Sequence, residues 1–224
     1  MPGPLVVIAL ALAAIAATLR RRRQRRRLPA RAVIVSPRKS TVIARDGGVR
    51  SVQSAELMLE PAALERLWSA TNLENLARTY WRFLSKVTLG LIRVIYGTDT
   101  RSVVLLGRPL TMLRFDAPEY GLESDHGSVR WQIRDGLLVA RAGRGSGYLA
   151  LDVTREPIGP DGRAKLLIEV EVANFYPSIA AGLSMPVYEM TQSVIHVLVT
   201  HAFLRSLAKL RLSESKVGLL ARQP

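Results

Sequence analysis

The sequence predicts an α+β fold in which an antiparallel, curved sheet of six or seven strands packs against a long C-terminal helix and two N-terminal helices. One N-terminal transmembrane helix precedes it. An uninterrupted apolar run covers Leu5 to Leu19, apolar and polar residues alternate repeatedly between residues 103 and 174, and apolar residues spaced by three and four flank that region. The sequence therefore divides into an anchor (1–27), a linker (28–53), a single domain (54–212) and a loose tail (213–224).

The anchor ends in a block of basic residues. A cleaved signal peptide carries its positive charge before the apolar core, whereas here the charge follows, so an uncleaved membrane anchor is favoured over a processed signal or a peripheral start. Basic residues beside a span are retained inside, which predicts an outside N-terminus and a cytoplasmic domain in a single-pass protein. Anionic lipid headgroups are the expected partners of the arginines: Arg20, Arg21, Arg22, Arg23, Arg25, Arg26 and Arg27.

The net charge of +14 is unevenly distributed. Residues 1–50 hold 12 Lys and Arg side chains against one acid, whereas the other 174 residues hold 20 basic and 17 acidic side chains. A nearly balanced domain argues against nucleic acid as a partner. The absence of cysteine excludes disulfides, thiol nucleophiles and thiolate metal sites.

Three helices are expected within the domain. Glu60-Pro61 begins a short helix that runs to about Ser69. Thr71 and Glu74 form a capping-box pattern at the start of a helix of about 25 residues, from Asn72 to Tyr96. A last helix runs from Ser184 to about Leu210.

Strands are expected where the apolar period changes to two. The strongest hairpin signal is Asp135-Gly136, which lies between an alternating strand and Leu137–Val139. The linker contains two β-like pieces, 32–35 and 41–44, either of which could add an edge strand. The expected strands of the domain are 103–106, 110–115, 120–124, 128–134, 148–154 and 164–174.

This order of elements resembles the helix-grip arrangement of START-type and polyketide-cyclase-like domains. The resemblance implies an apolar cavity between the curved sheet and the last helix, and it concerns element order only, because no family motif accompanies it. Trp131, Tyr148 and His201 are the candidate ligand-binding residues of that cavity.

Candidate chemistry is sparse. Glu169 and Glu171 share one face of a strand and are best explained as a solvated, charge-paired face. His196 and His201 lie about 140° apart around a helix, which does not favour a shared metal. His201 is either a hydrogen-bonded core histidine or a ligand contact. We therefore assign no catalytic residue, no metal ligand and no cofactor.

The leading hypothesis is a membrane-anchored protein whose cytoplasmic domain binds an apolar ligand or lipid. The alternative is a non-enzymatic, membrane-tethered interaction module that recruits a protein through the charged face of the sheet. An enzyme that uses the same cavity is the third and least supported class, because no motif specifies a reaction.

Overall fold

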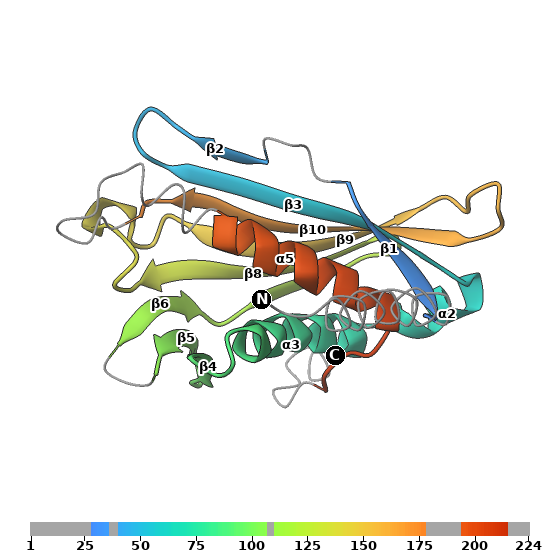
Figure 1. Cartoon of the computed structure of the whole chain (residues 1–224), viewed down its shortest axis with the longest axis horizontal. Helices are drawn as coiled ribbons and strands as arrows, with labels where there is room; N and C mark the ends of the chain where they lie inside the picture. The colour runs from blue at the N-terminus through green and yellow to red at the C-terminus, as the bar shows by residue number, and fades with distance from the viewer. Residues whose placement is uncertain (1–27, 36–39, 107–109, 178–193, 215–224) are drawn as a thin grey trace, which may run out of the picture.

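The computed structural model describes residues 28–35, 40–106, 110–177 and 194–214. In this part of the chain, ten strands form one antiparallel sheet in the order β1-β3-β10-β9-β8-β6-β5-β4, with β2 beside β3 and β7 beside β8. Helices α3 and α5 lie on the same face of the sheet, and α2 lies at one end (Figure 1). The expected antiparallel curved sheet with helices is confirmed, although it contains more strands than predicted.

The elements follow one another in three groups: N-terminal strands and helices, a run of strands, and a C-terminal helix. The strands are β1 (Ala30–Ile34), β2 (Thr41–Ile43), β3 (Val49–Leu59), β4 (Ile92–Tyr96), β5 (Thr100–Leu105), β6 (Thr111–Asp116), β7 (Glu119–Leu122), β8 (His126–Asp135), β9 (Tyr148–Glu156) and β10 (Ala164–Phe175). The helices are α2 (Pro61–Leu67), α3 (Ala70–Val87) and α5 (Val194–Ser206), with 3₁₀ turns η1 (Arg141–Gly143) and η3 (Leu207–Lys209).

The expected linker, residues 28–53, requires correction because β1, β2 and the start of β3 occupy much of it. Asp46 and two glycines form the turn between β2 and β3, in which the Gly48 amide donates to Asp46 Oδ1 at 3.0 Å and Gly47 has a φ of 85°. The strand pattern of β3 was hidden because two inward positions, Ser51 and Gln53, are polar although buried. Both β-like pieces join the sheet through β3.

The long helix expected from Asn72 to Tyr96 was wrong in its last nine residues, 88–96. Helix α3 ends at Val87, and the chain turns through Leu89 and Gly90, both at positive φ, into strand β4. The Gly90 amide donates to the Ser85 carbonyl at 2.8 Å, and this bond closes the helix end. The short run after Leu91 satisfies both helical and strand periods, so spacing alone could not decide between them.

The Asp135-Gly136 hairpin was also wrong, since β8 pairs with β9 across a longer connection that contains η1. Gly136, with a φ of 144°, crosses β6 so closely that a Cβ would lie 2.3 Å from the Met112 carbonyl oxygen. The Leu137 and Leu138 amides then donate to carbonyls at the start of β6, at 3.1 Å each. Glycine is required there for close backbone approach rather than for a two-residue turn.

Parts of three predicted segments lie outside the described residues. These are the anchor at 1–27, the first half of the last helix before α5, and most of the tail. Across the described ranges, no helix combines the length and apolarity needed to cross a bilayer. The Ser213 amide, at the start of the expected tail, donates to Thr79 Oγ1 on α3 at 2.8 Å.

An aromatic cluster holds the two long helices on the sheet. The centre of the Trp81 ring on α3 lies 5.3 Å from the centre of the Trp131 ring on β8 and 5.4 Å from the centre of the Phe115 ring on β6. Tyr80, also on α3, meets Phe203 of α5 edge to face at 5.2 Å. Edge-to-face pairs of this kind add about 0.5–1.5 kcal/mol each beyond the area that they bury. The centre of the sheet is therefore filled by side chains.

Removing one ring from this cluster should destabilise the fold. Phe203 is fully buried, so Phe203→Ala is expected to lower the free energy of unfolding by about 3–5 kcal/mol. Leu198→Ala on the same helix is the control, because Leu198 is 62% exposed and its loss should change that energy by less than about 0.5 kcal/mol. Urea unfolding followed by circular dichroism measures both, and equal effects would contradict this packing.

Candidate functional site

An apolar pocket of about 70 Å³ lies between the inner face of the sheet and the corner where α2 meets α3. Its sheet wall comes from β3, β7, β8, β9 and β10, and its helical wall from α2, α3 and the segment after α5. The residues that shape it most are aliphatic: Leu57, Leu64, Leu76, Val153, Leu166 and Leu210. The pocket is open to solvent on one side and is suited to an apolar group.

A glycine on β8, Gly127, lines this pocket. Gly127 lies between Leu122 of β7 and Val153 of β9 and is in phase with the buried Val129 and Trp131. The alternation of β8 therefore calls for an apolar side chain at residue 127, and none is present. A Cβ there would lie 3.3 Å from Leu122 Cδ1 and 3.5 Å from Leu73 Cδ1. Any side chain at residue 127 would therefore press on these two leucines, which themselves line the pocket.

The polar atoms at the pocket are engaged in the helix junction. Ser69 Oγ caps α3 by accepting from the Asn72 amide at 3.2 Å, so the N-cap is Ser69 rather than the predicted Thr71. Asn72 Nδ2 donates to the Arg66 carbonyl at 3.1 Å. Because these bonds lie within the helical corner, the remaining surface of the pocket is hydrocarbon.

Trp131 lies inside the aromatic cluster, 1% exposed, rather than in the apolar pocket. It lines a second, smaller cavity of about 20 Å³ beside α3, together with Glu74, Arg101 and Tyr120. Burial, with the nearby Glu74 charge, raises the pKa of Tyr120 to about 12. This cavity is polar and too small for more than a water-sized group.

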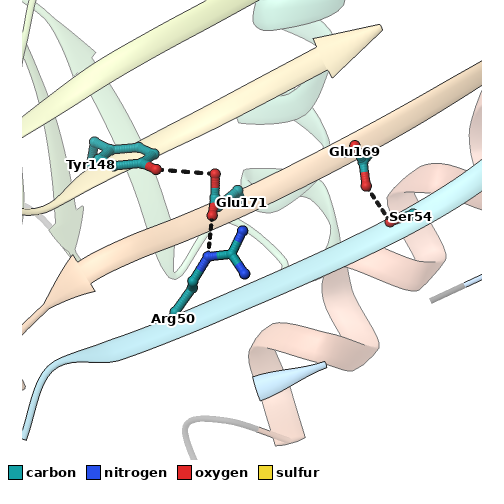
Figure 2. A network of polar contacts seen from close by, with 5 residues as sticks. All are labelled: Arg50, Ser54, Tyr148, Glu169 and Glu171. Carbon is teal, nitrogen blue, oxygen red and sulfur yellow. Dashed lines mark hydrogen bonds and ion pairs between the residues drawn. The ribbon is translucent and has the colours of Figure 1, made fainter. Parts of the chain in front are cut away.

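Tyr148 lies on the opposite, outer face of the sheet (Figure 2). Its hydroxyl donates to Glu171 Oε2 at 3.1 Å, and Arg50 Nε donates to Glu171 Oε1 at 2.6 Å. The Arg130 guanidinium covers the Tyr148 ring at 3.8 Å, while Ser54 and Glu169 pair nearby. Burial and the Glu171 carboxylate raise the pKa of the Tyr148 hydroxyl. Tyr148 thus belongs to a charge-paired surface and lines neither of the two cavities described above.

The same surface explains the two strand carboxylates. Glu169 and Glu171 make the bonds described above, and Lys165 makes two further ion pairs. Its Nζ lies 3.4 Å from Glu56 Oε2 and 3.2 Å from Glu156 Oε2. His126 lies 3.4 Å from Asp152, whose pKa is raised chiefly by burial. The expectation of cross-strand charge pairs on a solvated face is confirmed by these contacts.

His201 of α5 reaches a buried amide on the sheet. Its Nε2 lies 2.7 Å from Gln53 Oε1, and Gln53 Nε2 donates to the Ser40 and Ser51 hydroxyls. Burial lowers the pKa of His201, and the neighbouring Arg205 charge lowers it further. Of the two alternatives, the hydrogen-bonded core histidine describes this geometry.

The three candidate residues are therefore not brought together. Trp131 lies in the core, Tyr148 lies on the outer face of the sheet, and His201 is hydrogen-bonded to Gln53. The pocket residues were expected only as core. The signal for the pocket was Gly127, in phase with the apolar positions of its strand. In the described ranges, no group of three His, Asp or Glu side chains is arranged to hold a metal ion.

No protein-family model matches the chain, and no curated protein matches it in sequence. Among solved structures, an uncharacterised protein from Rhizobium leguminosarum is similar over 72% of this chain and 99% of its own, at 14% identity and a TM-score of 0.33. Human STARD10 is similar over 76% and 72%, at 10% identity and a TM-score of 0.31. Norcoclaurine synthase from Thalictrum flavum, a point mutant with a transition-state analogue, is similar over 72% and 95%, at 14% identity and a TM-score of 0.30. At these scores we draw no function from the likenesses.

The lowered pKa of His201 predicts acid sensitivity. The fold favours the neutral ring, so its contribution to stability is complete above the unfolded pKa of about 6.5 and is lost as pH falls toward the lower folded pKa. Between pH 7 and pH 5, the free energy of unfolding should fall more steeply for the natural chain than for His201→Gln. Urea unfolding at the two pH values measures this difference, and parallel slopes would contradict it.

Proposed function

We propose that this chain is a single-pass, membrane-anchored protein whose cytoplasmic domain takes an apolar ligand, such as the end of a lipid acyl chain, into the pocket beside Gly127. The observation that carries the proposal is the pocket itself, which is hydrocarbon-lined and open on one side. The resemblance in element order to helix-grip domains agrees with ligand binding but does not carry it. The anchor and its orientation rest on the apolar run and the arginines that follow it.

The size of the pocket limits what it takes. Small-molecule sites usually measure about 300–1,000 Å³, so a pocket of about 70 Å³ suits the end of a chain rather than a whole lipid. Each methylene group removed from water contributes about 0.8 kcal/mol. Several methylene groups would therefore supply moderate affinity, with the rest of the ligand outside the pocket.

The alternative, an interaction module that uses the charged face of the sheet, receives less support. The charges of that face are already paired with one another, as Arg50 is with Glu171 and Lys165 is with Glu56. A partner would have to replace these contacts rather than meet free charges. An enzyme at the pocket receives least support, since the residues that line it carry no acid, base or nucleophile poised for a reaction.

Photocrosslinking tests the pocket. The full chain in lipid nanodiscs is irradiated with a fatty acid that carries a terminal diazirine, and the crosslinked peptides are identified by mass spectrometry. We expect crosslinks on the peptides that contain Leu57 and Leu166. Gly127→Val should reduce them, because losing room for two methylene groups costs about 1.6 kcal/mol, or roughly tenfold in affinity.

Ser128→Val is the matched control, since it adds the same side chain one position along β8 on the opposite face. It should leave the crosslinks unchanged. Crosslinks that are equal in both variants, or confined to residues 1–27, would overturn the proposed ligand site.

Topology has its own test. The chain contains no cysteine, so Gly3→Cys and Ile158→Cys each give a single reactive thiol. A membrane-impermeant maleimide added to intact cells should label residue 3 and leave residue 158 unlabelled until the cells are broken. Labelling of residue 158 in intact cells would reverse the proposed orientation.

A further inference from the structure

The end of α3, the start of β4, the end of β5 and the start of β6 lie at one end of the molecule (Figure 1). Several aliphatic residues in these segments are exposed. The most exposed of them are Leu89, at 93%, and Leu106, at 68%. We name this group the leucine tip; its members are Val87, Leu89, Leu91, Leu106, Leu110 and Leu137.

Backbone hydrogen bonds tie the tip into one surface. The Leu106 amide donates to the Leu91 carbonyl at 2.8 Å, and the Leu105 amide donates to the Leu110 carbonyl at 3.0 Å. The Leu137 amide donates to the Thr111 carbonyl at 3.1 Å. Loops that are distant in sequence therefore meet, and their leucines form a cluster rather than scattered exposed residues.

The backbone at the tip does not favour leucine. Leu89 has a φ of 53° and Leu106 a φ of 59°, in the left-handed region that glycine and asparagine adopt far more readily. Neither side chain gains from burial in the fold, since both project into solvent. Leucine is thus unfavourable at these positions for two reasons, because it strains the left-handed backbone and exposes an apolar side chain to water. The second reason disappears if another apolar phase covers the side chain.

A line of basic residues leads along α3 to the tip. Arg78, Arg82 and Lys86 recur at four-residue spacing and so lie on one face of the helix. The one acid of α3, Glu74, lies one turn before Arg78 in the same row but is buried, so it adds no exposed negative charge. Arg93, exposed on β4, continues the positive charge beyond the tip. We name Arg78, Arg82 and Lys86 the basic stripe.

We propose that the leucine tip and the basic stripe form a membrane-docking surface, in which the tip enters the interface of an anionic bilayer and the stripe lies on its headgroups. Aliphatic loops beside exposed basic side chains suit this phase, and the nearby Asp135, two residues before Leu137, is paired with Arg114 at 3.5 Å. A protein interface would be expected to offer aromatic side chains and hydrogen-bonding groups at its centre, and the tip is formed by leucine and valine alone. The surface is independent of the ligand pocket, which lies at the opposite end of α3.

Single-cysteine labelling of the full chain tests this surface. Leu89→Cys and the control Ile158→Cys, which is 63% exposed on the β9–β10 loop, each carry an environment-sensitive fluorophore in vesicles. In phosphatidylcholine–phosphatidylserine vesicles, we expect the label at 89 to shift to the blue and to be quenched by spin-labelled acyl chains. Its accessibility to aqueous iodide should be several times lower than that of the label at 158.

Charge reversal and lipid composition supply the matched comparisons. Arg82→Glu with Lys86→Glu, in the Leu89→Cys background, should abolish the blue shift, because both side chains are exposed and their charge is what attracts the anionic surface. Pure phosphatidylcholine vesicles should weaken the shift in the same way. The anchor is present in every sample, so its behaviour does not alter these comparisons.

Three outcomes would overturn the inference. Labels at 89 and 158 that remain equally accessible in anionic vesicles would show that the tip stays in water. Protection at 89 that appears without vesicles and grows with protein concentration would assign the tip to a second copy of the chain. Protection that survives charge reversal would remove the basic stripe from the surface.

Discussion

The contact between α3 and the sheet is the interaction on which the rest of the structure depends. Trp81 inserts between Phe115 and Trp131, while Tyr80 meets Phe203, so a single turn of α3 joins the sheet to α5. These rings fill the centre of the inner face, and the larger of the two described cavities lies beside the N-terminal part of α3. The place of the pocket is thus a consequence of where the aromatic side chains fall.

Much of the architecture could be predicted from periodicity. Strands β8, β9 and β10 have one apolar and one polar face, as their alternation predicted, and the structure places them side by side in the sheet. The errors arose where local spacing is ambiguous, as in the five residues of β4, or where inward positions are polar, as at Ser51 and Gln53 on β3. In both cases partners that are distant in sequence decide the conformation.

The candidate site was less predictable than the fold, for a physical reason. A pocket forms where side chains do not completely fill the space between the layers. The sequence shows which residues face inward but not how completely they fill that space. Trp131 and His201 were expected to line a ligand cavity, with a hydrogen-bonded core histidine as the alternative for His201, whereas their actual neighbours, Trp81 and Gln53, depend on the tertiary register. Gly127 carried the one local signal, a missing side chain in an apolar phase.

Helix α3 links the two proposed membrane contacts. The arginine run ends at Arg27, and only Leu28 and Pro29 separate it from β1. The first residue of β1, Ala30, pairs with Leu59, which lies next to α2. A bilayer anchor would therefore hold the α2 end of the domain, and the leucine tip lies at the other end of α3, about 27 Å away for an 18-residue helix. Two contacts at that separation would fix the domain more firmly than either alone, because the second binds at the high effective concentration that the first provides. The basic stripe lies between them, where a bilayer surface joining both ends would pass.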